Sequence, residues 1–135
     1  MIDLVFVDTT IWVEALRRKP ERTAETLSGL MDEDRVALAE PVRLEVLSGA
    51  SRQTFRRLRE DLLAFPTFHA ERSTWLRMEE WVQLAVDKGE RFGIGDLLIA
   101  SITAEQDGRV WSRDDDFHRM SRLGFIQLFQ PPAPA

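Results

Sequence analysis

Four places in the chain carry carboxylates that together could bind a metal ion. Each lies beside an apolar segment: Asp8, Glu45, Asp96 and the run from Asp114 to Asp116. Carboxylate oxygens and water are the ligands that Mg²⁺ and Mn²⁺ prefer in proteins. Such a cluster supports attack of metal-activated water on a phosphodiester, with the metal stabilising charge on the phosphate and on the leaving oxygen.

The cysteine and histidine content of the chain limits which side chains could bind a metal. The chain has no cysteine, which excludes a disulfide, a thiolate zinc site and a cysteine nucleophile. Its two histidines, His69 and His118, share no motif and receive no catalytic role. We therefore expect any metal to be held by oxygen ligands.

Each acidic position also has an ordinary explanation. Asp8 and Asp96 precede predicted helices and suit their N-caps, and Glu45 fits the exposed face of a short helix. At Asp96 the nearby glycines Gly93 and Gly95 favour a functional interpretation, because they allow the backbone to approach a strand or ligand closely. The combination of positions, and no single one, predicts the metal site.

The acidic run contains three neighbouring aspartates, of which one is expected to be the main metal ligand. Asp114 is nearest to the end of a predicted strand, so we rank it first. Asp116 ranks second, since it also suits the cap of the helix that follows. Asp115 is expected to be a solvated turn residue and dispensable.

Hydrophobic periodicity predicts alternating strands and helices. The expected strands are 2–7, 36–39, 65–68, 110–112 and 125–129, and the expected helices are 9–19, 23–32, 41–47, 52–63, 71–86, 96–106 and 117–122. This order indicates an α/β fold, a parallel sheet with helices on both faces. Ligands bind outside the carboxyl ends of such strands, where Asp8 and Asp114 are expected.

Length and charge limit the remaining possibilities. A chain of 135 residues with 44% hydrophobic residues suits one domain, expected over residues 1–130, followed by a disordered Pro/Ala tail at 131–135. The net charge of −5 argues against bulk coating of nucleic acid but does not exclude a nuclease. Without a signal-type start or a long apolar run, the protein is expected to be cytoplasmic and not bound to a membrane.

Four motifs give the chain a family resemblance. They are VDTTIW at 7–12, LEVLSG at 44–49, GDLLIA at 95–100 and SRDDDF at 112–117. In order and spacing they resemble the PIN-domain ribonucleases, and among these the VapC toxins of prokaryotic toxin–antitoxin pairs. The resemblance spans almost the whole chain.

The resemblance implies a role for each matching residue. Asp8, Glu45, Asp96 and Asp114 would be the acidic quartet that binds Mg²⁺, or Mn²⁺ in its place, with Asp116 an auxiliary metal ligand and Thr10 a supporting hydroxyl. It also implies a Mg²⁺-dependent endoribonuclease, an RNA substrate, a VapB-like antitoxin and a homodimer. The alternative is a catalytically inactive module of the same fold that binds RNA or a protein partner.

Overall fold

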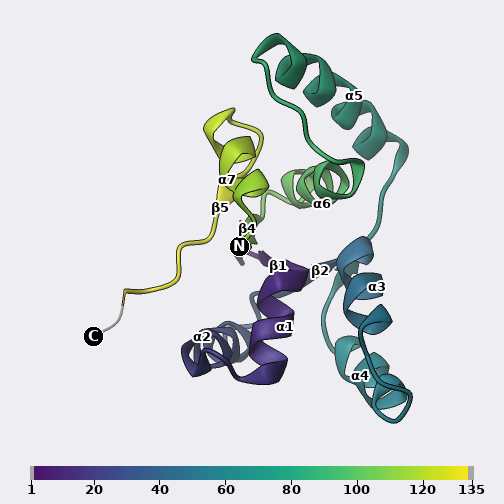
Figure 1. Ribbon diagram of the computed structural model, residues 1–135, viewed down its shortest axis with the longest axis vertical. Helices are drawn as coiled ribbons and strands as arrows, with labels where there is room; N and C mark the ends of the chain where they lie inside the picture. Colours follow the sequence, from purple (N-terminus) through teal and green to yellow (C-terminus); the bar gives the residue numbers. More distant parts are fainter. Residues whose placement is uncertain (1, 134–135) are drawn as a thin grey trace.

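The computed structural model describes residues 2–133 and contains a central parallel sheet (Figure 1). Its strands, in chain order, are β1 (Val5–Val7), β2 (Val36–Ala39), β3 (Thr67–Phe68), β4 (Arg109–Trp111) and β5 (Gln127–Leu128). All neighbouring strands pair in parallel, in the order β3-β2-β1-β4-β5. The predicted α/β fold is therefore confirmed.

Helices cover this sheet on both sides (Figure 1). Within the described residues they are α1 (Thr9–Arg17), α2 (Glu21–Asp32), α3 (Glu40–Ser48), α4 (Phe55–Leu62), α5 (Arg72–Asp87), α6 (Ile94–Glu105) and α7 (Asp115–Arg122). Helices α1 and α2 lie on one side of the central strands, and α5, α6 and α7 lie on the other. The site residues come from both groups.

The two central strands bring distant segments of the chain together. β1 is buried along its whole length, as its continuous apolar run predicts for a strand covered on both faces. Val7 is in register with Trp111, and the Asp8 backbone N–H donates to the Trp111 carbonyl at 2.9 Å. Because β1 and β4 end side by side, Asp8 and Ser112 leave the sheet as neighbours.

Several element boundaries differ from the sequence prediction. β1 begins at Val5, where pairing with β2 and β4 starts, and Ile2 is exposed. α4 begins at Phe55, because the hydroxyls of Ser51 and Thr54 hydrogen bond at 2.8 Å and form a turn before it. α6 and α7 both begin two residues earlier than expected, which changes the place of the acidic residues in them.

The last part of the described chain contacts α2. The Arg22 guanidinium donates to the Pro132 carbonyl at 2.8 Å. Residues 134–135 of the predicted tail lie outside the described residues, so its disorder stays a prediction. Among residues 2–133 no helix is both long enough and apolar enough to cross a membrane.

Candidate metal centre

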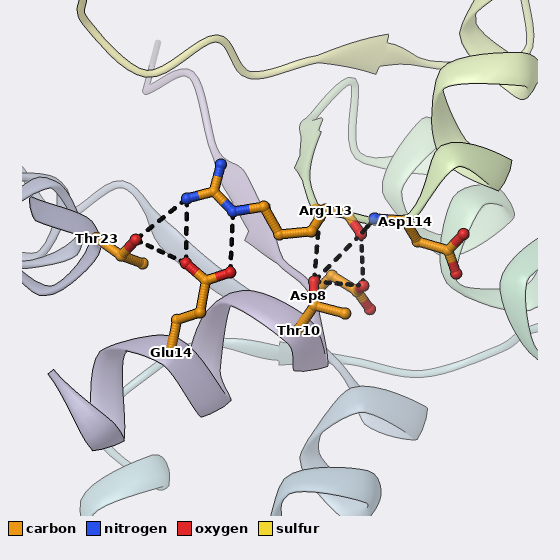
Figure 2. A network of polar contacts seen from close by, with 7 residues as sticks. Asp8, Thr10, Glu14, Thr23, Arg113 and Asp114 are labelled. Carbon is orange, nitrogen blue, oxygen red and sulfur yellow. Dashed lines mark hydrogen bonds and ion pairs between the residues drawn. The ribbon is translucent and has the colours of Figure 1, made fainter. Parts of the chain in front are cut away.

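Asp8 is a buried carboxylate held by two hydroxyls. The residue is 6% exposed, and its Oδ2 accepts a hydrogen bond from Ser112 Oγ at 2.6 Å and one from Thr10 Oγ1 at 3.3 Å (Figure 2). Burial raises the pKa of Asp8, the hydrogen bonds oppose that rise, and the charge of Asp114 adds to it. Asp8 stands at the N-cap of α1 but makes no side-chain cap hydrogen bond, so its carboxylate is turned to the site.

Asp96, Asp114 and Asp116 bring three carboxylates together. One oxygen of each lies within 4.8 Å of the others. Asp96 is in the first turn of α6, and the other two are at the start of α7, so two helix N-termini face this cluster. Partial positive charge at helix N-termini favours carboxylates there. The structure thus places three of the sequence-predicted site residues within reach of one cation.

Within this cluster the environment raises the pKa of Asp96. Burial and the neighbouring carboxylates of Asp116, Asp114 and Asp8 raise the pKa of Asp96 to about 7. Like charges held together in this way disfavour ionisation, and a divalent cation between them relieves the cost. An all-oxygen donor set under such repulsion fits Mg²⁺ or Mn²⁺.

Asp114 also caps helix α7, a role that the sequence prediction gave to Asp116. Asp114 is the N-cap of α7, and its Oδ1 accepts from the Asp116 backbone N–H at 2.9 Å. The expected cap at Asp116 is therefore wrong, because the helix begins at Asp115 and Asp116 already lies in its first turn. The Asp115 side chain is 79% exposed and pairs with Arg119 at 3.9 Å.

Arg119 fixes the carboxylate of Asp116. Its guanidinium donates to Asp116 Oδ1 at 2.5 Å, pairs with Glu90 and lies over the Phe92 ring, 4.6 Å from the centroid. Hydrogen bonding from Arg119 holds the pKa of Asp116 below its usual value. Sequence reasoning missed Arg119, although its spacing of three from Asp116 on a helix could have revealed the pair.

Glu45 lies outside the group of three. It is exposed on α3, and it is not among the carboxylates within 4.8 Å of one another. Partial burial of its carboxyl group, and the charge of Asp8, nevertheless raise the pKa of Glu45. Its charge therefore acts on the same site from the α3 side.

The predicted approach of Gly93 and Gly95 to a ligand stays a prediction, but neither glycine is needed for a close approach to a strand, because a Cβ built on either would meet no protein atom within 4 Å. That approach occurs at Gly108, where a Cβ would lie 2.6 Å from the Phe6 ring. Ser112, which donates to Asp8, was predicted as a strand residue and as part of a family motif, but it was given no role in the site; its place at a strand end beside the acidic run was the available signal.

Comparison with known proteins agrees with this architecture. The PIN domain family model matches residues 5–123. The chain belongs to the PIN-domain family, and the resemblance inferred from its motifs is confirmed.

The relatives are VapC proteins. VapC ribonuclease Mb1587 from Mycobacterium bovis and ribonuclease VapC11 from Mycobacterium tuberculosis are each 29% identical over 129 residues, covering 92% of this chain and 96% of theirs. The solved structure of FitAcB from Neisseria gonorrhoeae aligns at a TM-score of 0.76 and 21% identity, over 95% of this chain and 98% of that one. VapBC-1 from nontypeable Haemophilus influenzae aligns at 0.75 and 19% identity, over 93% and 96%. The chain is thus homologous to VapC ribonucleases and shares their fold.

Proposed function

We propose that this protein is a Mg²⁺-dependent endoribonuclease and the toxin of a VapBC-type pair. The observation that carries the proposal is the convergence of three carboxylate oxygens from Asp96, Asp114 and Asp116 within 4.8 Å at the carboxyl edge of the sheet, with buried Asp8 beside them. Homology to VapC ribonucleases supports RNA as the substrate.

The residues of the site would have two kinds of role, metal binding and orientation of the metal ligands. Asp8, Asp96, Asp114 and Asp116, with Glu45 from the α3 side, would hold the cation. When bound, a divalent cation there lowers the pKa of water and stabilises negative charge on the phosphodiester. Ser112 and Thr10 orient the Asp8 carboxylate through their hydroxyls. Because the pKa of Asp96 is raised to about 7, part of the metal-free protein carries a proton on Asp96 at neutral pH, and a positive charge in the cluster would favour its release.

An antitoxin partner and a second copy of the chain complete the proposal. Among the structural relatives is a toxin–antitoxin complex from Klebsiella pneumoniae, with a TM-score of 0.69. A groove of about 460 Å³ beside Glu45, lined by apolar residues of α1, α3 and α4 such as Val13 and Leu58, offers a surface for the antitoxin. Exposed apolar side chains on α5, Trp75 and Val82 among them, offer one for the second copy.

The direct test is metal-dependent cleavage of RNA by the purified chain. We expect cleavage with Mg²⁺ or Mn²⁺, complete loss with EDTA and recovery when excess Mg²⁺ is returned. The Asp96→Asn variant purified in parallel controls for contaminating nuclease. Cleavage that persists in EDTA would exclude the proposed chemistry, and metal binding without cleavage would favour the inactive binding module.

Substitutions in the acidic run are expected to differ in effect. Asp114→Asn should lower cleavage at least about a hundredfold, because it removes a charge from the cluster. Asn still caps α7, so the fold is retained. Asp116→Asn should cost about tenfold, since Arg119 already neutralises part of that charge. Asp115→Asn should leave the rate within about twofold of wild type, because its side chain faces solvent. Initial rates at saturating Mg²⁺ measure this order, and greatest damage from Asp115→Asn would mean that the loop is wrongly assigned.

A further inference from the structure

Arg113 lies between Ser112 and Asp114, but its side chain turns away from them toward α1 and α2 (Figure 2). Its Nε donates to Glu14 Oε2 at 3.0 Å, and its Nη2 donates to Glu14 Oε1 at 3.1 Å. Two parallel hydrogen bonds of this kind fix the orientation of both groups, which a single charge contact does not. Arg113 and Glu14 are thus joined in one defined geometry.

A buried hydroxyl closes this contact into a triangle. Thr23, on α2, is 2% exposed; its Oγ1 accepts from Arg113 Nη2 at 3.1 Å and donates to Glu14 Oε1 at 2.8 Å. Partial burial acts to raise the pKa of Glu14, but the hydrogen bonds from Arg113 and Thr23 outweigh it and hold that pKa below its usual value. The contact therefore stays charged at neutral pH and joins α1, α2 and the segment after β4.

The backbone of the same segment leads into the metal centre. The Arg113 backbone N–H donates to Thr10 Oγ1 at 3.1 Å, and the Asp114 N–H donates to Ser112 Oγ at 2.9 Å. Ser112 Oγ in turn donates to Asp8. The segment 112–114 is therefore tied to α1 twice, by its backbone at Thr10 and by the Arg113 side chain one turn further along the helix.

We infer that Glu14 and Arg113 form a positioning pair for the metal centre. By holding the segment 112–114 against α1, the pair sets the separation of the Asp8 and Asp114 carboxylates and so the affinity of the site for a divalent cation. Both residues act through the segment 112–114, as positioning residues and not as metal ligands. The inference rests on the proposed function, because it assumes that these carboxylates bind metal.

The strand that precedes Arg113, β4, supplies a matched control. Arg109, at the start of β4, pairs with Asp3 through its Nε at 3.0 Å, and its side chain is 40% exposed against 47% for Arg113. This ion pair lies at the opposite end of the strand from the metal centre. Arg109→Gln therefore makes the same chemical change as Arg113→Gln away from the site.

The experiment is calorimetric titration of the full chain with Mn²⁺. We expect about tenfold weaker binding in Arg113→Gln, Arg113→Lys and Glu14→Gln, and unchanged binding in Arg109→Gln. Arg113→Lys is decisive because it keeps the charge and loses the paired hydrogen bonds. If Arg113 acted only as a nearby positive charge, Arg113→Gln would bind Mn²⁺ more tightly and Arg113→Lys would match wild type.

Two further readouts separate positioning from general stability. The double variant Glu14→Gln with Arg113→Gln should lose no more affinity than the worse single variant, because both act through one contact. Thermal unfolding curves measured without metal should show that every variant is still folded at the titration temperature. The positioning role would be wrong if the losses of Mn²⁺ affinity were additive in the double variant, or if the single variants bound Mn²⁺ as tightly as wild type. It would also be wrong if all three single variants were unfolded at the titration temperature. A wild-type chain that binds no Mn²⁺ would instead overturn the metal centre itself.

Discussion

Asp96→Asn is expected to abolish RNA cleavage while it stabilises the metal-free protein. Asp96 is the carboxylate on which burial and the charges of Asp116, Asp114 and Asp8 converge. The substitution removes the charge at nearly constant volume and so weakens cation binding. A loss of about 3 kcal/mol in transition-state stabilisation lowers the rate at least about a hundredfold. Initial rates with Mg²⁺ and Mn²⁺ measure this effect.

The same variant should change how stability depends on pH. In the folded protein the pKa of Asp96 is raised from 3.8 to about 7, so the folded state binds a proton that the unfolded state has released. Stability from this group is complete below about pH 4 and is lost as the pH rises through about 7. Burial acts in the same direction on Asp8, whereas the lowered pKa of Asp116 acts in the opposite one.

Metal-free wild type should therefore unfold more easily at pH 7.5 than at pH 5.5, and Asp96→Asn should reduce that difference. Because Asp96 is only partly buried, we expect its contribution to the difference in unfolding free energy between the two pH values to be about 1 to 2 kcal/mol, less than full burial would give. Thermal unfolding in EDTA at both pH values measures it. Asp32→Asn, at an exposed position on α2, is the control and should change neither rate nor pH dependence. Wild-type cleavage by Asp96→Asn would remove Asp96 from the site.

The sequence predicted the parts of this site that depend on local pattern. A continuous apolar run is typical of a strand buried on both faces, so Val5 to Val7 and the carboxylate that follows could be placed at the sheet edge. The helical segments around Glu45 and Asp96 followed from periodicity in the same way. These patterns need no knowledge of how distant segments meet.

The contacts that orient the carboxylates could not be predicted in this way. Ser112 donates to Asp8 across 104 positions and Arg113 contacts Glu14 across 99, because β1 and β4 pair in one particular register. Nothing in the residues near either partner specifies that register. In the triangle, Arg113 reaches Thr23 across 90 positions, which is equally non-local, whereas Thr23 and Glu14 are only 9 apart and meet where α1 packs on α2.

The cap predicted at Asp116 was wrong for a different reason. Whether Asp114 or Asp116 caps α7 depends on a shift of two residues in the start of a short helix. Aspartates at three successive positions suit the cap almost equally, so propensity cannot decide between them. The backbone decides, because Asp114 has extended φ and ψ of −75° and 126° and accepts from the Asp116 N–H.

Asp8→Asn is expected to abolish cleavage and to leave the metal-free fold intact. Asp8 is 6% exposed, and its charge adds to the repulsion on Asp96 and Glu45. Asparagine keeps the volume and an oxygen that can accept from Ser112, while it removes a buried charge. We expect a rate loss of at least about a hundredfold and a change in stability within about 1 kcal/mol of wild type. Mn²⁺ titration should show weaker binding.

Two further variants distinguish the charge of Asp8 from its hydrogen bonds. Asp8→Ala leaves the hydroxyls of Ser112 and Thr10 without their acceptor, so it should destabilise the metal-free protein by about 1 to 3 kcal/mol as well as abolish cleavage. Ser112→Ala removes the shortest hydrogen bond but keeps the carboxylate, so it should retain measurable cleavage at about a tenth of the wild-type rate. If Ser112→Ala were inactive and Asp8→Asn active, the hydroxyl at the end of β4 would hold the catalytic role that the geometry gives to the buried carboxylate after β1.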